Sequence, residues 1–214
     1  MAVKRNKIMI VGCGPGARDY LTAAGQREIE SAEVLIGANR LLDLFPETAA
    51  ERIPVGKDME AVMQAIADRW EKSRVAILVT GDPGLYSLAS SVIQRFGREA
   101  CEIVPGISAL QTAFARLGIG WEDARIISTH AVKADLYGEE LHEYAKIAIL
   151  GGDRELVPRL APLLKYFLDR GYRIFAGEDL TLPEELFYEI GSDRLEGLRV
   201  STRTILLIVR GDIL

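Results

Sequence analysis

The sequence predicts an α/β protein of two αβα domains, the first with a mostly parallel sheet and the second with a mixed sheet. Three observations predict this fold class. Apolar runs typical of buried strands alternate with segments of helical periodicity in the first half of the chain. Those runs end in loops rich in glycine and proline. In the second half, helices become fewer and strands of hairpin type follow. We expect the ligand cleft between the two domains.

The first predicted domain covers residues 1–118 and alternates strands with helices. The expected strands are short apolar runs at 7–11, 33–36, 75–79 and 102–104. The expected helices lie at 22–31, 40–44, 59–70, 88–96 and 109–117. Asn39, Asp58 and Ser108 are suitable N-caps for three of these helices, and Gly118 is a suitable stop for the last. Because strands and helices alternate, the sheet should be mostly parallel.

The second predicted domain covers residues 124–214, after a linker without clear periodicity at 118–123. Its expected helices lie within 138–144 and at 154–169. Its expected strands lie at 125–128, 147–150, 173–176, 186–190 and 204–209. The last two strands resemble hairpin strands, so the second sheet should be mixed.

Composition excludes several classes of function. The chain has 214 residues, a net charge of −5 and a pI near 5.2, so it offers no basic surface for a nucleic acid. Its two cysteines, Cys13 and Cys101, stand in no pattern typical of a disulfide framework or a zinc site. We therefore expect two reduced thiols and no bound metal.

The basic N-terminus does not indicate export. Lys4, Arg5 and Lys7 precede an apolar run that is broken at Gly12, whereas a secretory signal needs roughly 7 to 15 apolar residues. No stretch approaches the roughly 18 apolar residues of a membrane span. We expect a cytoplasmic protein.

The strand at 75–79 is the centre of the predicted first sheet, and it stops at Gly81, Asp82, Pro83 and Gly84. Open α/β sheets bind their ligands at the carboxyl ends of strands. Glycine allows a ligand to approach bare backbone, and the carboxylate is a fixed acceptor. The alternative is that these residues only form the turn between a strand and a helix.

The loop at 12–17 matches the pattern G-x-G-x-x-A of dinucleotide-binding proteins. Two observations count against that interpretation. Helical periodicity begins only around Leu21 or Thr22, and the second strand ends at Gly37 rather than near an acidic residue for a ribose. A nicotinamide-dependent oxidoreductase is therefore a less favoured alternative.

Three such loops, at 12–16, 81–84 and 105–108, follow three predicted strands of one domain. In their order and spacing, and with Tyr86 and residues 115–118, they resemble the tetrapyrrole (corrin/porphyrin) methylase family. The resemblance covers nearly the whole chain. It implies a two-domain enzyme that transfers a methyl group from S-adenosylmethionine (SAM), its co-substrate, and that forms a homodimer.

Finer features resemble the branch of the family that methylates C5 of cobalt-precorrin-7 or precorrin-7 in cobalamin biosynthesis. These features are residues 37–42, 121–124 and 177–184. The length resembles branch members without a fused domain, which implies a separate C15-methyltransferase and decarboxylase as functional partner. The chain departs from the branch at 128–132, where Ala131 and Val132 replace a usual Gly-Arg pair. The resemblance therefore does not predict which substrate contacts that strand makes.

The resemblance also implies SAM contacts at matching positions. In the first predicted domain these are Pro15, Thr80, Gly81, Asp82, Leu85, Ser108 and Ala109. In the second they are Leu150, Leu180 and Ile205. The sulfonium of SAM carries its own activation, so the transfer requires no metal, and the site needs backbone groups, an acceptor for hydroxyls and apolar packing.

The sequence does not identify a general base. His130 and His142 are its only histidines, and His130, near the end of a predicted strand, is the candidate. A lone histidine is more often structural or solvated. Asp19, Tyr20 and Tyr86 could touch substrate but serve equally well as loop packing.

Two further alternatives remain open. One is a methylase for another tetrapyrrole position or for a non-tetrapyrrole acceptor such as a modified histidine. The other is a binding protein without catalytic activity on the same fold.

Overall fold

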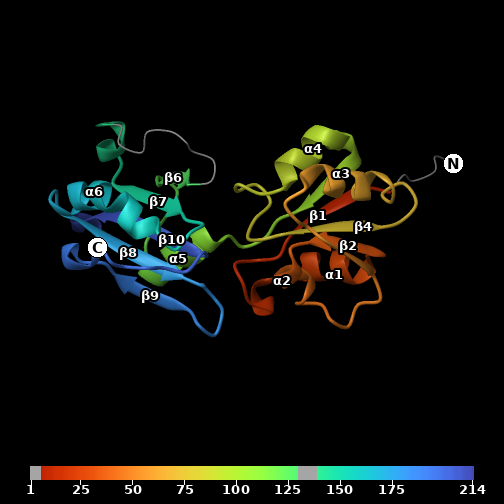
Figure 1. Cartoon of the computed structure of the whole chain (residues 1–214), viewed down its shortest axis with the longest axis horizontal. Helices are drawn as coiled ribbons and strands as arrows, with labels where there is room; N and C mark the ends of the chain where they lie inside the picture. The colour runs from red at the N-terminus through yellow and green to blue at the C-terminus, as the bar shows by residue number, and fades with distance from the viewer. Residues whose placement is uncertain (1–5, 130–138) are drawn as a thin grey trace. The chain divides into compact units, whose positions relative to one another are not determined.

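The computed structural model describes residues 6–129 and 139–214. By the contacts among its residues the chain divides into two compact units, Met1–Ser108 and Ala109–Leu214. Each unit is built on its own β-sheet, parallel in the first unit and mixed in the second (Figure 1). The predicted fold class is confirmed in these respects.

The sheet of the first unit has the strand order β3-β2-β4-β1-β5, with every neighbouring pair parallel. Its strands are β1 (Ile8–Gly12), β2 (Val34–Gly37), β3 (Glu51–Pro54), β4 (Val75–Val79) and β5 (Cys101–Val104). Its α-helices are α1 (Ala23–Ser31), α2 (Asn39–Leu42), α3 (Met59–Ala67) and α4 (Ala89–Phe96). Two 3₁₀ helices complete it, η1 (Arg18–Tyr20) and η2 (Arg98–Ala100).

Helices cover both faces of this sheet, which explains its continuous apolar strands. Helices α3 and α4 lie on one face, and α1 and α2 lie on the other (Figure 1). Alternate residues of β1 enter the two cores: Ile8 and Ile10 pack with α3 and α4, and Val11 packs with α1 and α2. All five residues of β4 are buried, as a central parallel strand requires.

Side-chain caps start two helices of this unit. Asp58 caps α3 as predicted, because its carboxylate accepts a hydrogen bond from the Ala61 amide at 3.1 Å. Thr22 caps α1 in the same way, through the Gly25 amide at 3.0 Å. Helix α2 begins at Asn39, so this residue is not the cap that the sequence predicts, and Ala38 takes that place.

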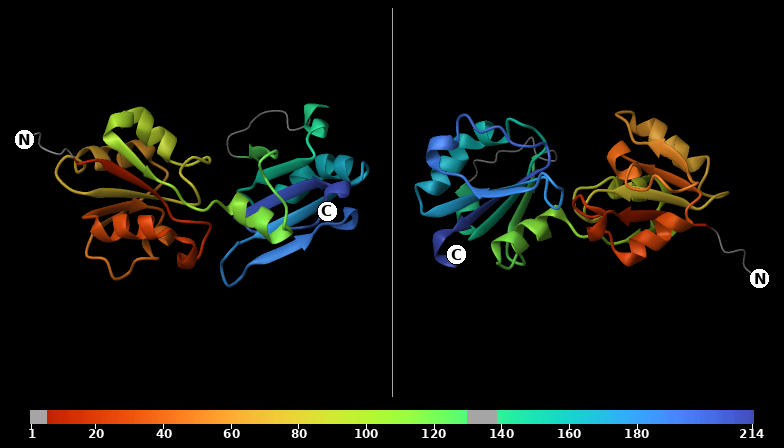
Figure 2. Two further views of the ribbon diagram at one scale, coloured as in Figure 1. Left: turned by 180° about the vertical axis from the view of Figure 1, so that it is seen from behind. Right: turned by 90° about the horizontal axis from the view of Figure 1, so that it is seen from below.

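The mixed sheet of the second unit has the order β6-β7-β10-β8-β9, in which only the pair β6 and β7 is parallel among the described strands. Its strands are β6 (Arg125–Ser128), β7 (Lys146–Leu150), β8 (Tyr172–Glu178), β9 (Leu186–Glu189) and β10 (Thr204–Arg210). Its helices are α5 (Ala109–Leu117), α6 (Leu156–Leu168), η3 (Glu139–Glu143), η4 (Ser192–Arg194) and η5 (Gly211–Ile213). Helix α6 buries its apolar side against the sheet, and α5 packs with β10 (Figure 2).

The unit boundary lies ten residues earlier than the sequence predicts, at Ser108 rather than at Gly118. Helix α5 groups with the second unit because it packs with β10 and buries Leu110, Ala113 and Phe114. Gly118 ends the helix as expected, with φ +74° and its amide bonded to the Phe114 carbonyl at 2.9 Å.

The segment predicted as a linker, 118–123, is also part of the second unit. Lys146, at the start of β7, donates a hydrogen bond to the Gly120 carbonyl at 2.8 Å and forms an ion pair with Asp123. Lys146 is nearly buried, so its ammonium group needs these partners. Among the described residues, no helix is long and apolar enough to cross a membrane.

Candidate functional site

The three glycine loops follow β1, β4 and β5, which are neighbours in the sheet, so the loops meet at its carboxyl edge. Gly14 and Gly81 form an isolated antiparallel bridge, in which the Gly81 amide donates to the Gly14 carbonyl at 2.8 Å. The Cys13 amide donates to the Val79 carbonyl at 2.8 Å. Backbone hydrogen bonds therefore hold the first two loops side by side.

Glycine is required where the loops converge. A Cβ atom at Gly12 would lie 2.6 Å from the Gly106 nitrogen and 2.7 Å from the Gly81 oxygen, and one at Gly106 would lie 2.7 Å from the Gly12 carbonyl carbon. Gly14 and Gly81 also have positive φ angles, +79° and +67°. The pattern that resembles a nucleotide fingerprint thus serves close packing between loops. Helix α1 begins at Ala23, which confirms the displaced helix start after the first loop.

Asp82 ties the second loop to the third. Its Oδ1 accepts a hydrogen bond from the Gly84 amide at 2.8 Å, and its Oδ2 accepts one from the Gly106 amide at 3.0 Å. The first contact belongs to the turn between strand and helix, which is the alternative interpretation of these residues. The second contact reaches across to another loop, so Asp82 does more than shape its own turn.

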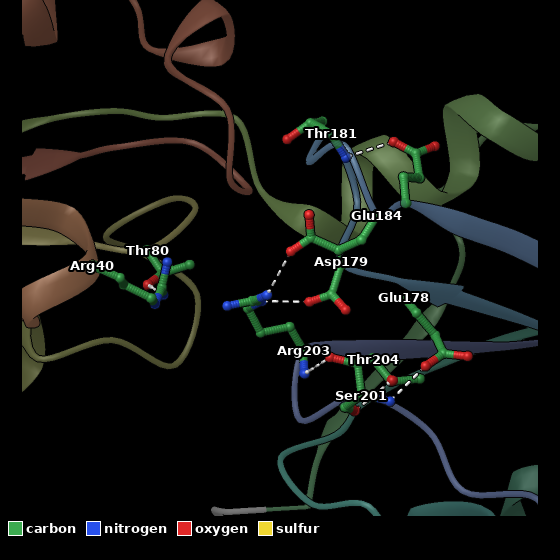
Figure 3. Close-up of polar contacts among 10 residues, drawn as sticks. Arg40, Thr80, Glu178, Asp179, Thr181, Glu184, Ser201, Arg203 and Thr204 are labelled. Atoms are coloured by element: carbon green, nitrogen blue, oxygen red, sulfur yellow. Dashed lines mark hydrogen bonds and ion pairs between the residues drawn. The ribbon is translucent and has the colours of Figure 1, made fainter. Parts of the chain in front are cut away.

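The other predicted SAM positions of the first unit lie on the same three loops. Pro15 is buried in the first loop, and Leu85 is half-buried in the second. Ser108 is buried at the end of the third loop, and Ala109 follows it as the first residue of α5. Thr80 is exposed, and the Arg40 guanidinium donates a hydrogen bond to its hydroxyl (Figure 3).

A cavity of about 230 Å³ opens at the carboxyl ends of β2 and β4. Its walls are mostly apolar, with the Thr80 and Tyr86 side chains among them. Tyr86 is 53% exposed and has φ +48°, which is rare for an aromatic residue. The lining residues are Ala38, Leu41, Val55, Leu78, Val79, Thr80, Tyr86, Ser87 and Leu88.

A larger cavity of about 390 Å³ lies at the amino ends of the strands, where Lys7, Arg74 and Glu102 line it. Open α/β sheets bind ligands at the carboxyl edge, so the smaller cavity, next to the second loop, is the better candidate site of the two.

The three predicted SAM positions of the second unit gather at one end of its sheet. Ile205 on β10 pairs with Leu150 on β7 and with Gly177 on β8. Leu180 covers Gly177, where a Cβ atom would lie 3.1 Å from the leucine methyl. Leu180 and Ile205 are buried and Leu150 is half-buried.

Leu180 stands between two residues with rare backbone conformations, Asp179 at φ +48° and Thr181 at φ +73°. Arg203 holds this segment in place: its Nε donates to the Asp179 carboxylate at 2.5 Å, and its carbonyl accepts from the Asp179 amide at 3.2 Å (Figure 3). The sequence does not indicate this arrangement, because no residue type marks a positive φ at a non-glycine residue.

A second group of polar residues that the sequence does not indicate centres on Glu178, which is buried at the end of β8. Its carboxylate accepts hydrogen bonds from the Tyr188 hydroxyl at 2.6 Å and from the Ser201 amide at 2.5 Å. Burial raises the pKa of Tyr188 well above its usual value, and the neighbouring Glu178 raises it further. The phenol therefore stays protonated and donates to Glu178.

The remaining candidates show no arrangement typical of catalysis. Burial raises the pKa of the Cys13 thiol to about 12, against the smaller opposing effect of Arg40, so this thiol is no nucleophile at neutral pH. His142 is exposed on η3. His130 lies outside the described residues, as do Ala131 and Val132. Within 6–129 and 139–214, no cluster of His, Cys, Asp and Glu could hold a metal ion.

Asp19 and Tyr20 lie on η1, directly after the first loop. The Tyr20 carbonyl approaches Gly14 so closely that a Cβ atom there would lie 2.8 Å from its oxygen. Packing of the first loop therefore accounts for the place of Tyr20.

Comparisons with known proteins agree with this geometry. The family pattern described as Tetrapyrrole (Corrin/Porphyrin) Methylases matches residues 7–193. The chain is 33% identical over 183 residues to the cobalt-precorrin-7 C(5)-methyltransferase of Salmonella typhimurium, which covers 83% of this chain and 87% of that protein.

Two solved structures share the fold. A cobalt precorrin-4 methyltransferase superimposes with a TM-score of 0.77 at 22% identity, covering 98% of both chains. The uroporphyrin-III C-methyltransferase of Thermus thermophilus, in complex with S-adenosylhomocysteine (SAH), superimposes with a TM-score of 0.76 at 19% identity, covering 96% of this chain and 98% of that one. With a family pattern that spans most of its length, the chain belongs to the tetrapyrrole (corrin/porphyrin) methylases and is a SAM-dependent C-methyltransferase.

Proposed function

We propose that the protein transfers a methyl group from SAM to C5 of the corrin precursor cobalt-precorrin-7 or precorrin-7 in cobalamin biosynthesis. The observation that carries this proposal is the convergence of the three loops around Gly12, Gly81 and Gly106. The similarity to the Salmonella enzyme of that name, over most of both chains, supports this choice of substrate within the family.

We further propose that SAM contacts the ten predicted positions. These are Pro15, Thr80, Gly81, Asp82, Leu85, Ser108, Ala109, Leu150, Leu180 and Ile205. The residues fit such a ligand, because the loops offer backbone amides and carbonyls, the Thr80 hydroxyl and apolar side chains. Bound SAM supplies an electrophilic methyl group on a positive sulfur.

The contribution of the chain is then to hold both reactants in line, which can lower a barrier by several kcal/mol, roughly 7 to 11 in favourable cases. The geometry supports this role, because Asp82 fixes two of the loops to each other through charge-assisted hydrogen bonds. Such positioning requires that the residues in contact with the reactants are held rigidly.

Two assembly proposals accompany this function. The protein would form a homodimer, as the resemblance to its family implies, and sedimentation at 23.6 kDa at all practical concentrations would contradict this. A separate C15-methyltransferase and decarboxylase would be its functional partner.

Calorimetric titration and a product assay test the function. We expect dissociation constants on the order of micromolar for SAM and SAH and no heat from NADH or NADPH. Incubation with SAM and cobalt-precorrin-7 should add one methyl group, which carbon-13 labelling of the SAM methyl would place at C5 by NMR. Binding of a nicotinamide nucleotide without SAM binding would reject the methylase function, and a label at another carbon would reject the ring position.

A further inference from the structure

Arg40 is an exposed arginine at the carboxyl edge of the first sheet. It lies on α2, which follows the end of β2 directly, and its guanidinium donates a hydrogen bond to the Thr80 hydroxyl after β4 (Figure 3). Its positive charge also acts on Cys13, where it lowers the pKa of the thiol against the larger effect of burial. The guanidinium therefore lies beside both the first and the second glycine loop.

The same guanidinium lies at the rim of the 230 Å³ cavity. Thr80, its hydrogen-bond partner, lines that cavity, and so do Ala38 and Leu41 on either side of it in the chain. The other walls are mainly aliphatic, and the exposed Tyr86 ring adds an aromatic surface. A positively charged guanidinium therefore lies next to an apolar cavity.

The charge of the whole chain makes a local cation important. At a net charge of −5, the protein as a whole repels anions, whereas tetrapyrrole precursors carry several carboxylates around an apolar ring, and SAM carries one. An arginine can bind a carboxylate through two parallel hydrogen bonds. The hydrogen bond from the Arg40 guanidinium to the Thr80 hydroxyl holds the guanidinium beside the cavity.

We propose that Arg40 binds a carboxylate of one of the two reactants at the rim of this cavity. The inference rests on the proposed methyltransferase function and deepens it, because it names a residue that recognises the acidic group of the ligand. The carboxylate belongs either to an acid side chain of the tetrapyrrole or to the methionine part of SAM, and the two sources respond differently to substitution.

The test compares Arg40→Gln with Arg40→Lys, and with Arg27→Gln as the matched control. Arg27 is equally an exposed helical arginine, on α1. Three quantities are measured in the full chain: the Kd of SAH, the Kd of 5′-methylthioadenosine, which lacks the carboxylate, and the KM of cobalt-precorrin-7. Thermal unfolding of each variant shows whether the fold survives.

If the carboxylate is on the tetrapyrrole, Arg40→Gln should raise KM about tenfold, with both Kd values unchanged. If it is on SAM, the Kd of SAH should rise about tenfold while that of 5′-methylthioadenosine stays the same. In either case Arg40→Lys should show a smaller loss because it keeps the charge, and Arg27→Gln should show none.

Two results would overturn the inference. The first is an Arg40→Gln enzyme whose three constants match those of the unchanged protein. The second is an equal loss of SAH and 5′-methylthioadenosine affinity, which would indicate general damage to the site. An unchanged protein that neither binds SAH nor turns over would reject the proposed function itself and the inference with it.

Discussion

At the scale of single residues, the glycines of the three loops allow the loop backbones to pack closely against one another, which the sequence pattern alone does not show. Gly12 and Gly106 stand so close that a side chain on either would meet backbone atoms of the other. Backbone atoms cannot rotate away as the end of a flexible side chain can, so the loops would have to separate.

We therefore expect Gly106→Ala to destabilise the protein by about 1 to 3 kcal/mol and to weaken SAH binding. Gly56→Ala is the matched control, because nothing lies within 4 Å of a Cβ atom there and neither glycine has a positive φ. Chemical denaturation and titration with SAH measure both effects. Equal stability of the two variants would contradict the steric role of Gly106.

Single loops could be predicted from the sequence, but the contacts between loops could not. The pattern around Gly81 and Asp82 correctly predicts a loop at the carboxyl end of a central strand. The hydrogen bond from the Gly106 amide to Asp82 could not be predicted, because its partners are 24 residues apart and meet only once β4, β1 and β5 lie side by side. The strained Asp179 and Thr181 have the same origin, since tertiary contacts such as that of Arg203 impose their conformations.

At the scale of elements, apolar periodicity predicts the buried strands and the long helices well. Strand β4 and helix α3 begin where the sequence places them, since the first is a continuous apolar run and the second has the Asp58 cap. Strand β3 was not predicted. It is an edge strand whose residues are exposed or half-buried, so its sequence contains no apolar run that would predict a strand.

The end of β8 depends on the contact between the buried Glu178 and the half-buried Tyr188 on the adjacent strand. Tyr188→Phe removes the hydroxyl that donates to a buried carboxylate, so we expect a loss of about 1 to 3 kcal/mol in the free energy of unfolding. Tyr166→Phe, at a side chain that is 37% exposed, is the control and should cost less than about 0.5 kcal/mol.

Denaturant unfolding of both tyrosine variants provides the measurement. A Tyr188→Phe protein as stable as Tyr166→Phe would show that Glu178 needs no donor from β9. Because Ser201 also donates to Glu178, the same variant should loosen the segment before β10, which amide exchange at Ser201 would report.

At the scale of the whole molecule, the sequence predicts two units and the mixed character of the second sheet, but not the place of the boundary. Gly118 ends a helix and is followed by a segment without periodicity, and this pattern predicts the end of a domain. Which sheet a helix joins depends on its buried side chains, and Phe114 is fully buried in a helix that packs with β10. Helical periodicity reveals that such a face exists, not which sheet it covers.

The boundary leads to a prediction about fragments. A fragment of residues 109–214 keeps α5 with the second sheet, whereas a fragment of residues 119–214 leaves β10 without the helix that packs on it. Burial of one large apolar side chain contributes about 1.5 to 3 kcal/mol, and α5 buries both Leu110 and Phe114. We expect the longer fragment to melt cooperatively by circular dichroism and the shorter one to melt broadly and bind a hydrophobic dye. In the full chain Phe114→Ala should cost about 3 to 5 kcal/mol for the same reason. If both fragments melted equally and cooperatively, α5 would contribute nothing to the stability of the second unit, and the boundary would lie at Gly118 as the sequence predicts.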